Sequence, residues 1–284
     1  VLDGGSGTDT ASYAYVAGTV SVSLGIAGAQ TTGASGTDTL LRIENLYGSA
    51  FNDKLTGDAT ANVIEGGAGG DTIDGAAGAD TMIGDGGSDI YYVDNVGDTV
   101  TEISPDRATG GIDSVYTTLP AYTLPSNVEK LRILASGPAN GTGNSLDNSL
   151  YAGPGNNVLD GGGGTDTLSY LYATGAVSVS LNILDPQLTG GSGTDTLISI
   201  ENLYGGAFDD TLTGDANANR LDGGAGADTL IGGSGADTLV GGSGYDHFAF
   251  ETNFGSDRIT DFTPGEDVIQ LHVALGFNEF AELD

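Results

Sequence analysis

Residues 205–249 read GGAFDDTLT, GDANANRLD, GGAGADTLI, GGSGADTLV and GGSGYDHFA, which is five consecutive units of nine residues. Residues 48–92 repeat this pattern as GSAFNDKLT, GDATANVIE, GGAGGDTID, GAAGADTMI and GDGGSDIYY. In every unit the sixth residue is Asp or Asn, and the eighth residue is large and apolar. Short internal repeats of this kind indicate a chain that stacks one small structural unit on the next.

The nine-residue period predicts tight turns that alternate with short strands. The glycines permit the positive-φ backbone of the turns because they carry no Cβ, while the eighth residue of each unit points inward from a strand. Two units then form one coil of 18 residues, and successive coils stack as parallel strands about 4.8 Å apart. The expected fold is all-β, a parallel β-roll or β-helix-like solenoid.

A longer repeat has a period of 157 residues. The segment Val1-Leu2-Asp3-Gly4-Gly5 returns at residues 158–162, and the register holds through residues 94 and 251. We therefore expect two related units joined by a strand-rich connector. The expected segments are residues 1–94 for the first roll unit, 95–141 for the connector, 142–251 for the second roll unit and 252–284 for a C-terminal cap, which is incomplete.

Composition excludes several classes of protein. The 284 residues include 50 Gly but only 7 Pro, without a three-residue period, so collagen-like and proline-rich chains are excluded. The 39 acidic and 7 basic residues give a formal net charge of −32, which repels nucleic acids and anionic membranes. No apolar stretch is long enough for membrane insertion, and the absence of Cys removes thiolate metal sites. The first residues, Val1-Leu2-Asp3-Gly4-Gly5, read like the middle of a repeat, and we expect a fragment cut from a longer chain at both ends.

The positions of the acidic residues indicate a metal ion. In an 18-residue coil, Asp71 faces Asp53 and Asp89, and Asp228 faces Asp210 and Asp246. Stacked carboxylates repel unless a cation lies between them, and oxygen ligands from carboxylates and backbone carbonyls favour Ca²⁺. The candidate carboxylate ligands are Asp9, Asp38, Asp53, Asp71, Asp80, Asp89, Asp166, Asp195, Asp210, Asp228, Asp237 and Asp246. The candidate carbonyl ligands are Gly66, Gly69, Gly78, Gly87, Gly223, Gly226, Gly232, Gly235, Gly241 and Gly244.

These units resemble the RTX, or haemolysin-type calcium-binding, repeat with the pattern G-G-x-G-x-D-x-U-x. The best matches are GGSGTDTLI at 190–198, GGAGADTLI at 223–231 and GGSGADTLV at 232–240. The resemblance implies a parallel β-roll with several Ca²⁺ ions between its loops. It also implies type I secretion, folding outside the cell, and an extracellular or cell-surface location. Residues 259–271, ITDFTPGEDVIQL, resemble the cap that follows the last repeat array in this family.

Some units depart from the family pattern. Asn62, Asn148, Asn157 and Asn219 replace the sixth-position Asp, so we expect weak or absent binding at those loops. Phe51 and Phe208 stand where a turn glycine is expected, which indicates the first turn of each array rather than a full binding loop.

The expected function is calcium binding without catalysis, in a secreted adhesin or surface-layer component. The sequence contains no zinc-protease motif, no nucleophile elbow and no phosphate-binding loop. An alternative parent is an extracellular protease, lipase or alginate epimerase with a non-catalytic C-terminal repeat region. The open edge of a terminal coil also permits self-association.

A carbohydrate-binding module, with a cell-surface or glycan ligand, is a further alternative. Tyr13 and Tyr15, repeated as Tyr170 and Tyr172, are two residues apart and are expected to share one face of a strand. Exposed rings there would stack on sugars, whereas buried rings would fill the core. The core role is the favoured interpretation.

Overall fold

The computed structural model describes residues 1–103 and 109–271. Contacts between residues divide the chain into two units. The first comprises Val1–Ala135 with Gly143–Leu146, and the second comprises Ser136–Thr142 with Asp147–Asp284. Residues 272–284 of the expected cap lie outside the described residues. Among the described residues, no helix is long and apolar enough to cross a membrane.

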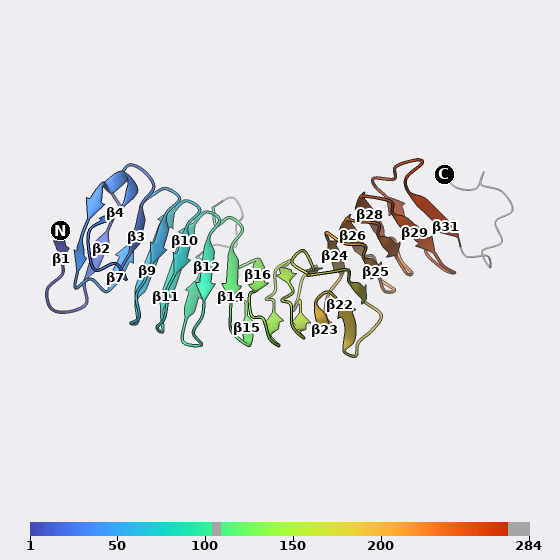
Figure 1. The fold of residues 1–284 in the computed structure, drawn as a ribbon, viewed down its shortest axis with the longest axis horizontal. Helices are drawn as coiled ribbons and strands as arrows, with labels where there is room; N and C mark the ends of the chain where they lie inside the picture. The colour runs from blue at the N-terminus through green and yellow to red at the C-terminus, as the bar shows by residue number, and fades with distance from the viewer. Residues whose placement is uncertain (104–108, 272–284) are drawn as a thin grey trace. The chain divides into compact units, whose positions relative to one another are not determined.

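The first unit is a coil whose short strands stack in parallel on two faces (Figure 1). One face holds β3 (Ser21–Ser23), β8 (Lys54–Thr56), β10 (Thr72–Asp74), β12 (Ile90–Val93), β14 (Ser114–Thr117) and β16 (Lys130–Ile133). The other holds β2 (Thr10–Ser12), β7 (Asn45–Tyr47), β9 (Val63–Ala68), β11 (Thr81–Gly86) and β13 (Thr99–Thr101). The remaining elements are β1 (Leu2–Asp3), β4 (Gln30–Thr31), the 3₁₀ helix η1 (Gly33–Ser35), β5 (Thr37–Asp38), β6 (Leu40–Leu41) and β15 (Ala121–Thr123).

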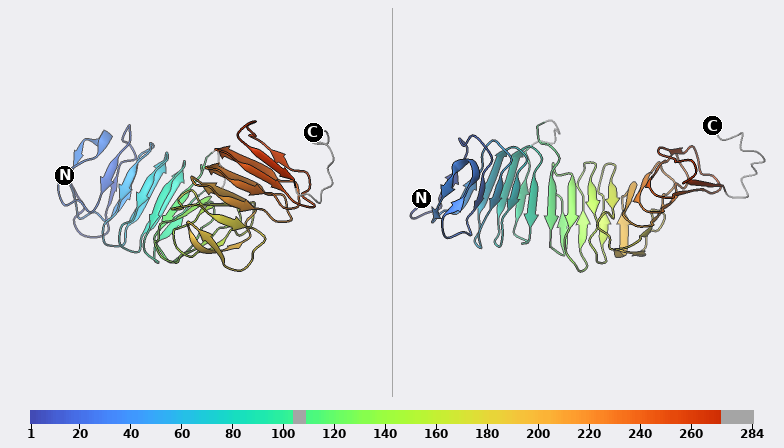
Figure 2. Two further views of the ribbon diagram at one scale, coloured as in Figure 1. Left: turned by 45° about the vertical axis from the view of Figure 1, so that its right-hand side comes forward. Right: turned by 45° about the horizontal axis from the view of Figure 1, so that its top comes forward.

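The second unit is also a coil of parallel strands, and its strands lie side by side in each view (Figure 2). One face holds β18 (Ser149–Tyr151), β20 (Thr167–Ser169), β24 (Asn202–Gly206), β26 (Arg220–Ala225), β28 (Thr238–Ser243) and β30 (Arg258–Ile259). A second holds β21 (Ser178–Ser180), β25 (Thr211–Thr213), β27 (Thr229–Ile231), β29 (His247–Phe250) and β31 (Val268–Leu271). A third group comprises β17 (Asn140–Thr142), β19 (Val158–Asp160), β22 (Gln187–Gly190) and β23 (Gly193–Ile198).

The register of the strands follows the expected coil of two repeat units. Thr72 of β10 pairs with Lys54 of β8 on one side and with Ile90 of β12 on the other, both in parallel. On the other face, Thr81 of β11 pairs with Val63 of β9. The all-β, parallel β-solenoid predicted from the repeats is therefore confirmed.

The core is a column of eighth-position side chains, one from each short strand. All of them are fully buried: Leu55, Ile64, Ile73, Met82 and Tyr91 in the first array, and Leu212, Leu221, Leu230, Leu239 and Phe248 in the second. Their neighbours at positions seven and nine are more exposed because successive side chains of a strand point to opposite faces. A fully buried side chain of this size stabilises the fold by about 1.5–3 kcal/mol, so each coil depends on its two inward residues.

The segment between the two arrays continues the first coil. Ser114 of β14 pairs with Ile90 of β12, and Lys130 of β16 pairs with Ser114, both in parallel. The strands β14 and β16 therefore extend the same face as the repeats before them. The four-segment division of the chain remains a prediction.

The last described strands extend the second unit beyond its final repeat. Val268 of β31 pairs with His247 of β29, and β30 pairs with β28. The Phe262 ring lies 6.2 Å from the ring of Phe248, measured between centroids. Residues 258–271 thus supply strand partners and an aromatic contact to the end of the array.

In the later units of each array, glycine at the fourth position is required by the stacking of the coils. Gly244 has φ +139°, and a Cβ there would collide with the carbonyl oxygen of Gly226 in the preceding coil. Gly87 and Gly69 are related in the same way. Any side chain at these positions would therefore separate adjacent coils.

We expect Gly244→Ala to lower the free energy of unfolding by at least about 2 kcal/mol, because it combines positive-φ strain with a backbone collision. Gly28→Ala is the control, since no atom lies within 4 Å of a Cβ at Gly28 and its φ is not positive. Urea denaturation of both variants in one buffer measures the difference. Equal midpoints would show that the coils tolerate a methyl group between them.

Candidate metal centre

The sixth-position carboxylates connect each coil to the one before it. Oδ1 of Asp71 accepts the backbone N–H of Asp53 at 2.7 Å, and Oδ1 of Asp89 accepts that of Asp71 at 2.6 Å. In the second array, Oδ1 of Asp228 accepts the N–H of Asp210 at 2.7 Å. The side chains point into the turns, where all five residues are buried.

The same contact recurs along both units. Asp80, Asp166, Asp195, Asp237 and Asp246 accept the backbone N–H groups of Asn62, Asn148, Asn157, Asn219 and Asp228, respectively, at 2.7–3.0 Å. The structure therefore aligns most of the predicted carboxylate ligands in ladders, with alternate repeat units in separate ladders. The donor and acceptor of each step are 18 residues apart, or 38 where the hairpin of β22 and β23 intervenes.

The second oxygen of many of these carboxylates is buried without a hydrogen-bond donor. Within the described residues, this is true of Oδ2 in Asp71, Asp80, Asp89, Asp166, Asp210, Asp228 and Asp237, and also in Asp9. An ionised carboxylate only accepts hydrogen bonds, and a buried polar atom without a partner costs about 1–3 kcal/mol, more when charged. Each of these oxygens therefore needs either a proton or a cation.

The first glycine of each unit leaves room for this oxygen. A Cβ on Gly66 would collide with Oδ2 of Asp71, and a Cβ on Gly223 would collide with Oδ2 of Asp228. In the same turns, the carbonyl oxygen of Gly69 faces Gly87 of the next coil, and that of Gly226 faces Gly244. Carboxylate and carbonyl oxygens therefore surround the turns, a donor set that fits a hard cation such as Ca²⁺.

Burial and neighbouring carboxylates make these groups poor acids. Burial, reinforced by the charges of Asp89 and Asp53, raises the pKa of Asp71 to about 7. Burial likewise raises the pKa of Asp228 to about 7 and that of Asp210 to about 6. Without a cation, part of the ladder therefore carries protons at neutral pH.

Three predicted ligands have other partners. Asp53 accepts the Val20 N–H at 2.7 Å through Oδ1, and its Oδ2 accepts the Ser49 N–H. Oδ2 of Asp38, in the β4–β5 hairpin, accepts the hydroxyls of Thr32 and Ser35, both at 2.9 Å. Both carboxylates thus have protein donors where the ladder members have an open oxygen.

Oδ2 of Asp195 similarly accepts the Thr189 hydroxyl at 3.1 Å. Burial raises the pKa of Asp195 to about 6 despite this bond. The metal-ligand role of Asp38, Asp53 and Asp195, like that of the other predicted carboxylate and carbonyl ligands, remains a prediction.

Two of the sixth-position asparagines, Asn62 and Asn219, have hydrogen-bond partners within the protein for both atoms of the side-chain amide. Nδ2 of Asn62 donates to the Glu44 carbonyl at 2.8 Å, and its Oδ1 accepts the Asp58 N–H at 2.8 Å. Asn219 makes the equivalent contacts with Glu201 and Asp215. At these two turns the amide leaves no open oxygen, whereas Oδ1 of Asn157 is buried without a donor among the described residues. Weaker binding at the Asn loops remains a prediction.

The ladder also contains acidic residues that the nine-residue pattern missed. Asp98, Asp113, Asp257 and Asp267 accept the N–H groups of Asp80, Asp89, Asp237 and Asp246 at 2.7–3.1 Å. Asp98 keeps the 18-residue spacing and could have been found from it. The other three lie 20–24 residues after their donors, so a fixed period does not find them.

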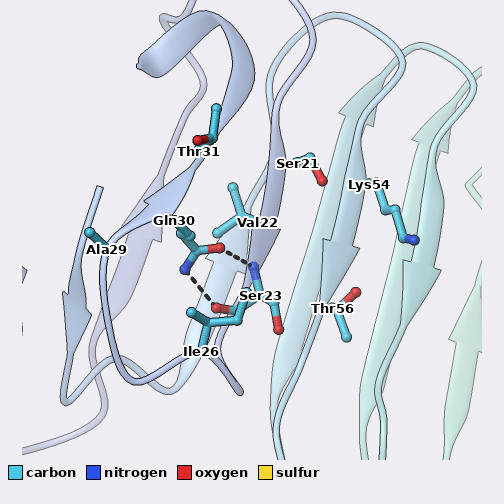
Figure 3. Close-up of a pocket in the computed structure, with 9 residues that line it drawn as sticks. All are labelled: Ser21, Val22, Ser23, Ile26, Ala29, Gln30, Thr31, Lys54 and Thr56. Atoms are coloured by element: carbon cyan, nitrogen blue, oxygen red, sulfur yellow. Dashed lines mark hydrogen bonds between the residues drawn. The ribbon is translucent and has the colours of Figure 1, made fainter. Parts of the chain in front are cut away.

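Each unit has its own small pocket beside a hairpin, and Figure 3 shows that of the first unit. In the first unit it encloses about 380 Å³ and is lined by residues that include Val22, Ile26 and Thr56. The Gln30 side chain bridges to the backbone of Ser23 through two hydrogen bonds of 2.8 Å. The second unit repeats it with about 270 Å³ and with Gln187 on Ser180. The glutamine amides thus serve the hairpins rather than the pockets.

The tyrosine pairs do not share a strand face. Tyr13 and Tyr170 are buried, whereas Tyr15 is fully exposed and Tyr172 is 43% exposed. Tyr13 and Tyr15 follow the end of β2, where a turn sends consecutive side chains to different environments. The prediction of a common face is wrong, and the core role holds for Tyr13 and Tyr170 only.

The described residues form a parallel β-solenoid with glycine turns and with stacked carboxylates whose second oxygens are buried without donors. These features define the class of protein, a calcium-binding β-roll. The sequence matches the RTX calcium-binding nonapeptide repeat over residues 42–73, 56–91, 65–100, 142–170, 189–230 and 213–248. Together these segments cover more than half of the chain, and the chain belongs to this family. Comparison with curated proteins found no match.

Cation binding should release protons from the ladder. Asp71 and Asp228 have pKa values of about 7 in the folded chain, against an ordinary value of 3.8. The ion-free fold therefore binds extra protons between these values, so its stability is greatest at low pH and falls as pH rises through about 7. Ca²⁺ must displace these protons, and its affinity should fall as pH is lowered from 8 to 5.5.

Calorimetric titration with Ca²⁺ at pH 6.5 in two buffers of different ionisation enthalpy measures the proton release. A titration at pH 9, above these pKa values, is the control and should show no buffer dependence. Identical heats in both buffers at pH 6.5 would contradict the protonation of the ladder.

Proposed function

We propose that this chain is the calcium-binding region of an extracellular or cell-surface protein, an adhesin or surface-layer component exported by type I secretion, and that it folds as it captures Ca²⁺. The observation that carries the proposal is the row of buried carboxylate oxygens without donors, exemplified by Asp71 and Asp228. Their positions in glycine turns give Ca²⁺ a set of oxygen ligands.

The charge of the chain supports folding coupled to binding. A formal net charge of −32 opposes compaction, and the core is a single column of side chains in each array. If each site has a dissociation constant near 10⁻⁴ M, millimolar Ca²⁺ adds about 1.4 kcal/mol per site. Several such sites together are comparable to the stability of a whole domain, about 5–15 kcal/mol.

The same energetics support export before folding. A chain that lacks Ca²⁺ inside the cell stays extended, as passage through a secretion channel requires, and folds where the cation is abundant. The role proposed here is non-catalytic, because the acidic residues are explained by the ladder that they form. The alternative parent is an extracellular protease, lipase or alginate epimerase that carries this chain as its non-catalytic region. A catalytic motif in the flanking reading frame favours that alternative, and repeated extender domains favour the adhesin.

We expect the chain to be largely unfolded in chelator at pH 8, above the pKa values of about 7 of Asp71 and Asp228, and to gain strand signal steeply with Ca²⁺. Circular dichroism during a Ca²⁺ titration measures this change, and Mg²⁺ at equal concentration is the control. If the chain in chelator shows the full strand signal of the Ca²⁺-bound form, folding does not depend on Ca²⁺ and the proposal is wrong.

Exchanging Asp and Asn in the second array tests which residues bind. Asp228→Asn removes the charge next to an oxygen that lacks a donor, so the number of bound Ca²⁺ ions should fall by at least one. The converse change, Asn219→Asp, replaces an amide that donates to the Glu201 carbonyl and should raise the number of bound ions. Equilibrium dialysis at saturating Ca²⁺ gives the ion counts. Unchanged counts in both variants would show that the sixth position does not hold the ion.

A further inference from the structure

The nine-residue pattern of the first array ends at an unusual group of carboxylates. Asp89 is the last sixth-position Asp of this array, and the carboxylate that accepts its backbone N–H belongs to Asp113, at 2.7 Å and 24 residues away. The preceding step of the ladder, from Asp71 to Asp89, spans 18 residues. Six additional residues therefore enter the coil at this point.

A third carboxylate joins Asp89 and Asp113 at the insertion. Glu102, which follows β13 and belongs to no nonapeptide, has a carboxylate oxygen within 4.8 Å of oxygens of both Asp89 and Asp113. All three side chains are buried, with exposures of 0%, 6% and 1% for Asp89, Glu102 and Asp113. Three acidic groups thus share one enclosed space.

Each of the three carboxylates has an oxygen without a partner. Among the described residues, no donor reaches Oδ2 of Asp89, Oε2 of Glu102 or Oδ2 of Asp113. The hydroxyl of Tyr91, itself fully buried, donates to Oε1 of Glu102. The ion pairs found in residues 1–103 and 109–271 join other residues, so no described Lys or Arg neutralises the group.

A glycine keeps the space between these oxygens open. A Cβ on Gly84 would collide with the Tyr91 hydroxyl, Oδ2 of Asp89 and Oε1 of Glu102 together. Oxygens from three side chains therefore converge above the Gly84 Cα, where an alanine methyl group would otherwise lie. This convergence is independent of the spacing between the carboxylates and indicates a cradle for a ligand.

We propose that Asp89, Glu102 and Asp113 hold one buried Ca²⁺ ion, with the Tyr91 hydroxyl beside it, at a site that shares Asp89 with the last nonapeptide loop and takes Glu102 and Asp113 from outside the repeats. The inference rests on the proposed calcium-binding function and adds a site that no repeat pattern supplies. A divalent ion balances most of the charge of three carboxylates. Ca²⁺ suits an irregular set of oxygens because its coordination number and geometry are variable, whereas Mg²⁺ requires a near-ideal octahedron.

The electrostatics of the group agree with this assignment. Burial raises the pKa of Glu102 to about 8 and that of Asp113 to about 7, and the charge of Glu129 contributes to both shifts. Bringing these groups together is therefore unfavourable unless a cation compensates. An ion here would join β12, β13 and β14 through one residue adjoining each strand and would hold the coil together across the insertion.

The first test is the number of Ca²⁺ ions bound to the full chain. Glu102→Gln removes one charge while preserving the size of the side chain, and native mass spectrometry in Ca²⁺ should show one ion fewer than in the unmodified chain. Glu251→Gln is the control, because Glu251 is exposed and lies outside the group. An unchanged count in Glu102→Gln overturns the site, even while Ca²⁺ binding by the repeats persists.

The second test uses Tb³⁺, whose luminescence is excited by energy transfer from a nearby tyrosine. The chain has no Trp, so tyrosines supply the energy transfer. Tyr91→Phe keeps an aromatic ring in the core but removes the tyrosine next to the ion. Sensitised Tb³⁺ emission should fall in Tyr91→Phe, whereas Tyr15→Phe, at a fully exposed position, should leave it unchanged. Equal emission from both variants overturns the site. This test also decides the case if Glu102→Gln fails to fold.

Discussion

The hydrogen bond from a backbone N–H to the Asp carboxylate of the next coil is the contact on which the rest of the structure depends. It links sequential coils at their turns, where the parallel strands cannot pair, as in the 2.7 Å bond from the Asp53 N–H to Asp71. Because one oxygen is used in this way, the other is held in a fixed, buried position. The structural bond therefore also creates the oxygen that needs a cation.

This dual use explains the residues around each carboxylate. The first glycine of a unit makes room for the second carboxylate oxygen, as Gly223 does for Asp228. The glycine at the fourth position allows the carbonyl of the preceding coil to approach, as Gly244 does for Gly226. The inward eighth residue requires only an apolar side chain of adequate size, so Leu, Ile, Met, Tyr and Phe all occur there. Sequence variation is thus tolerated in the core more than in the turns.

The sequence was sufficient to predict the coil, its register and its inward residues, because one period determines all three. It was insufficient wherever a contact joins residues outside that period. The Val20 N–H that occupies Asp53 comes from 33 residues away, and Asp113 follows an insertion that shifts its spacing to 24 residues. Glu102 carries no repeat signal at all. Likewise, the spacing of Tyr13 and Tyr15 predicts one strand face only if side chains keep alternating between the two faces of the strand. The strand β2 ends at Ser12, and the chain turns after it.

The Asp and Asn positions show how such a coil can divide its turns between two tasks. An Asn at the sixth position supplies its own donor, as Asn62 does to the Glu44 carbonyl, so its turn is complete without an ion. Most aspartates at the same position, such as Asp71 and Asp228, leave an open oxygen that requires a cation or a proton. In the first array, Asp53 and Asn62 both have protein donors, and the aspartates with an open oxygen, Asp71, Asp80 and Asp89, follow them. The first array can therefore begin from turns that need no cation, with the coils beyond them added as Ca²⁺ becomes available.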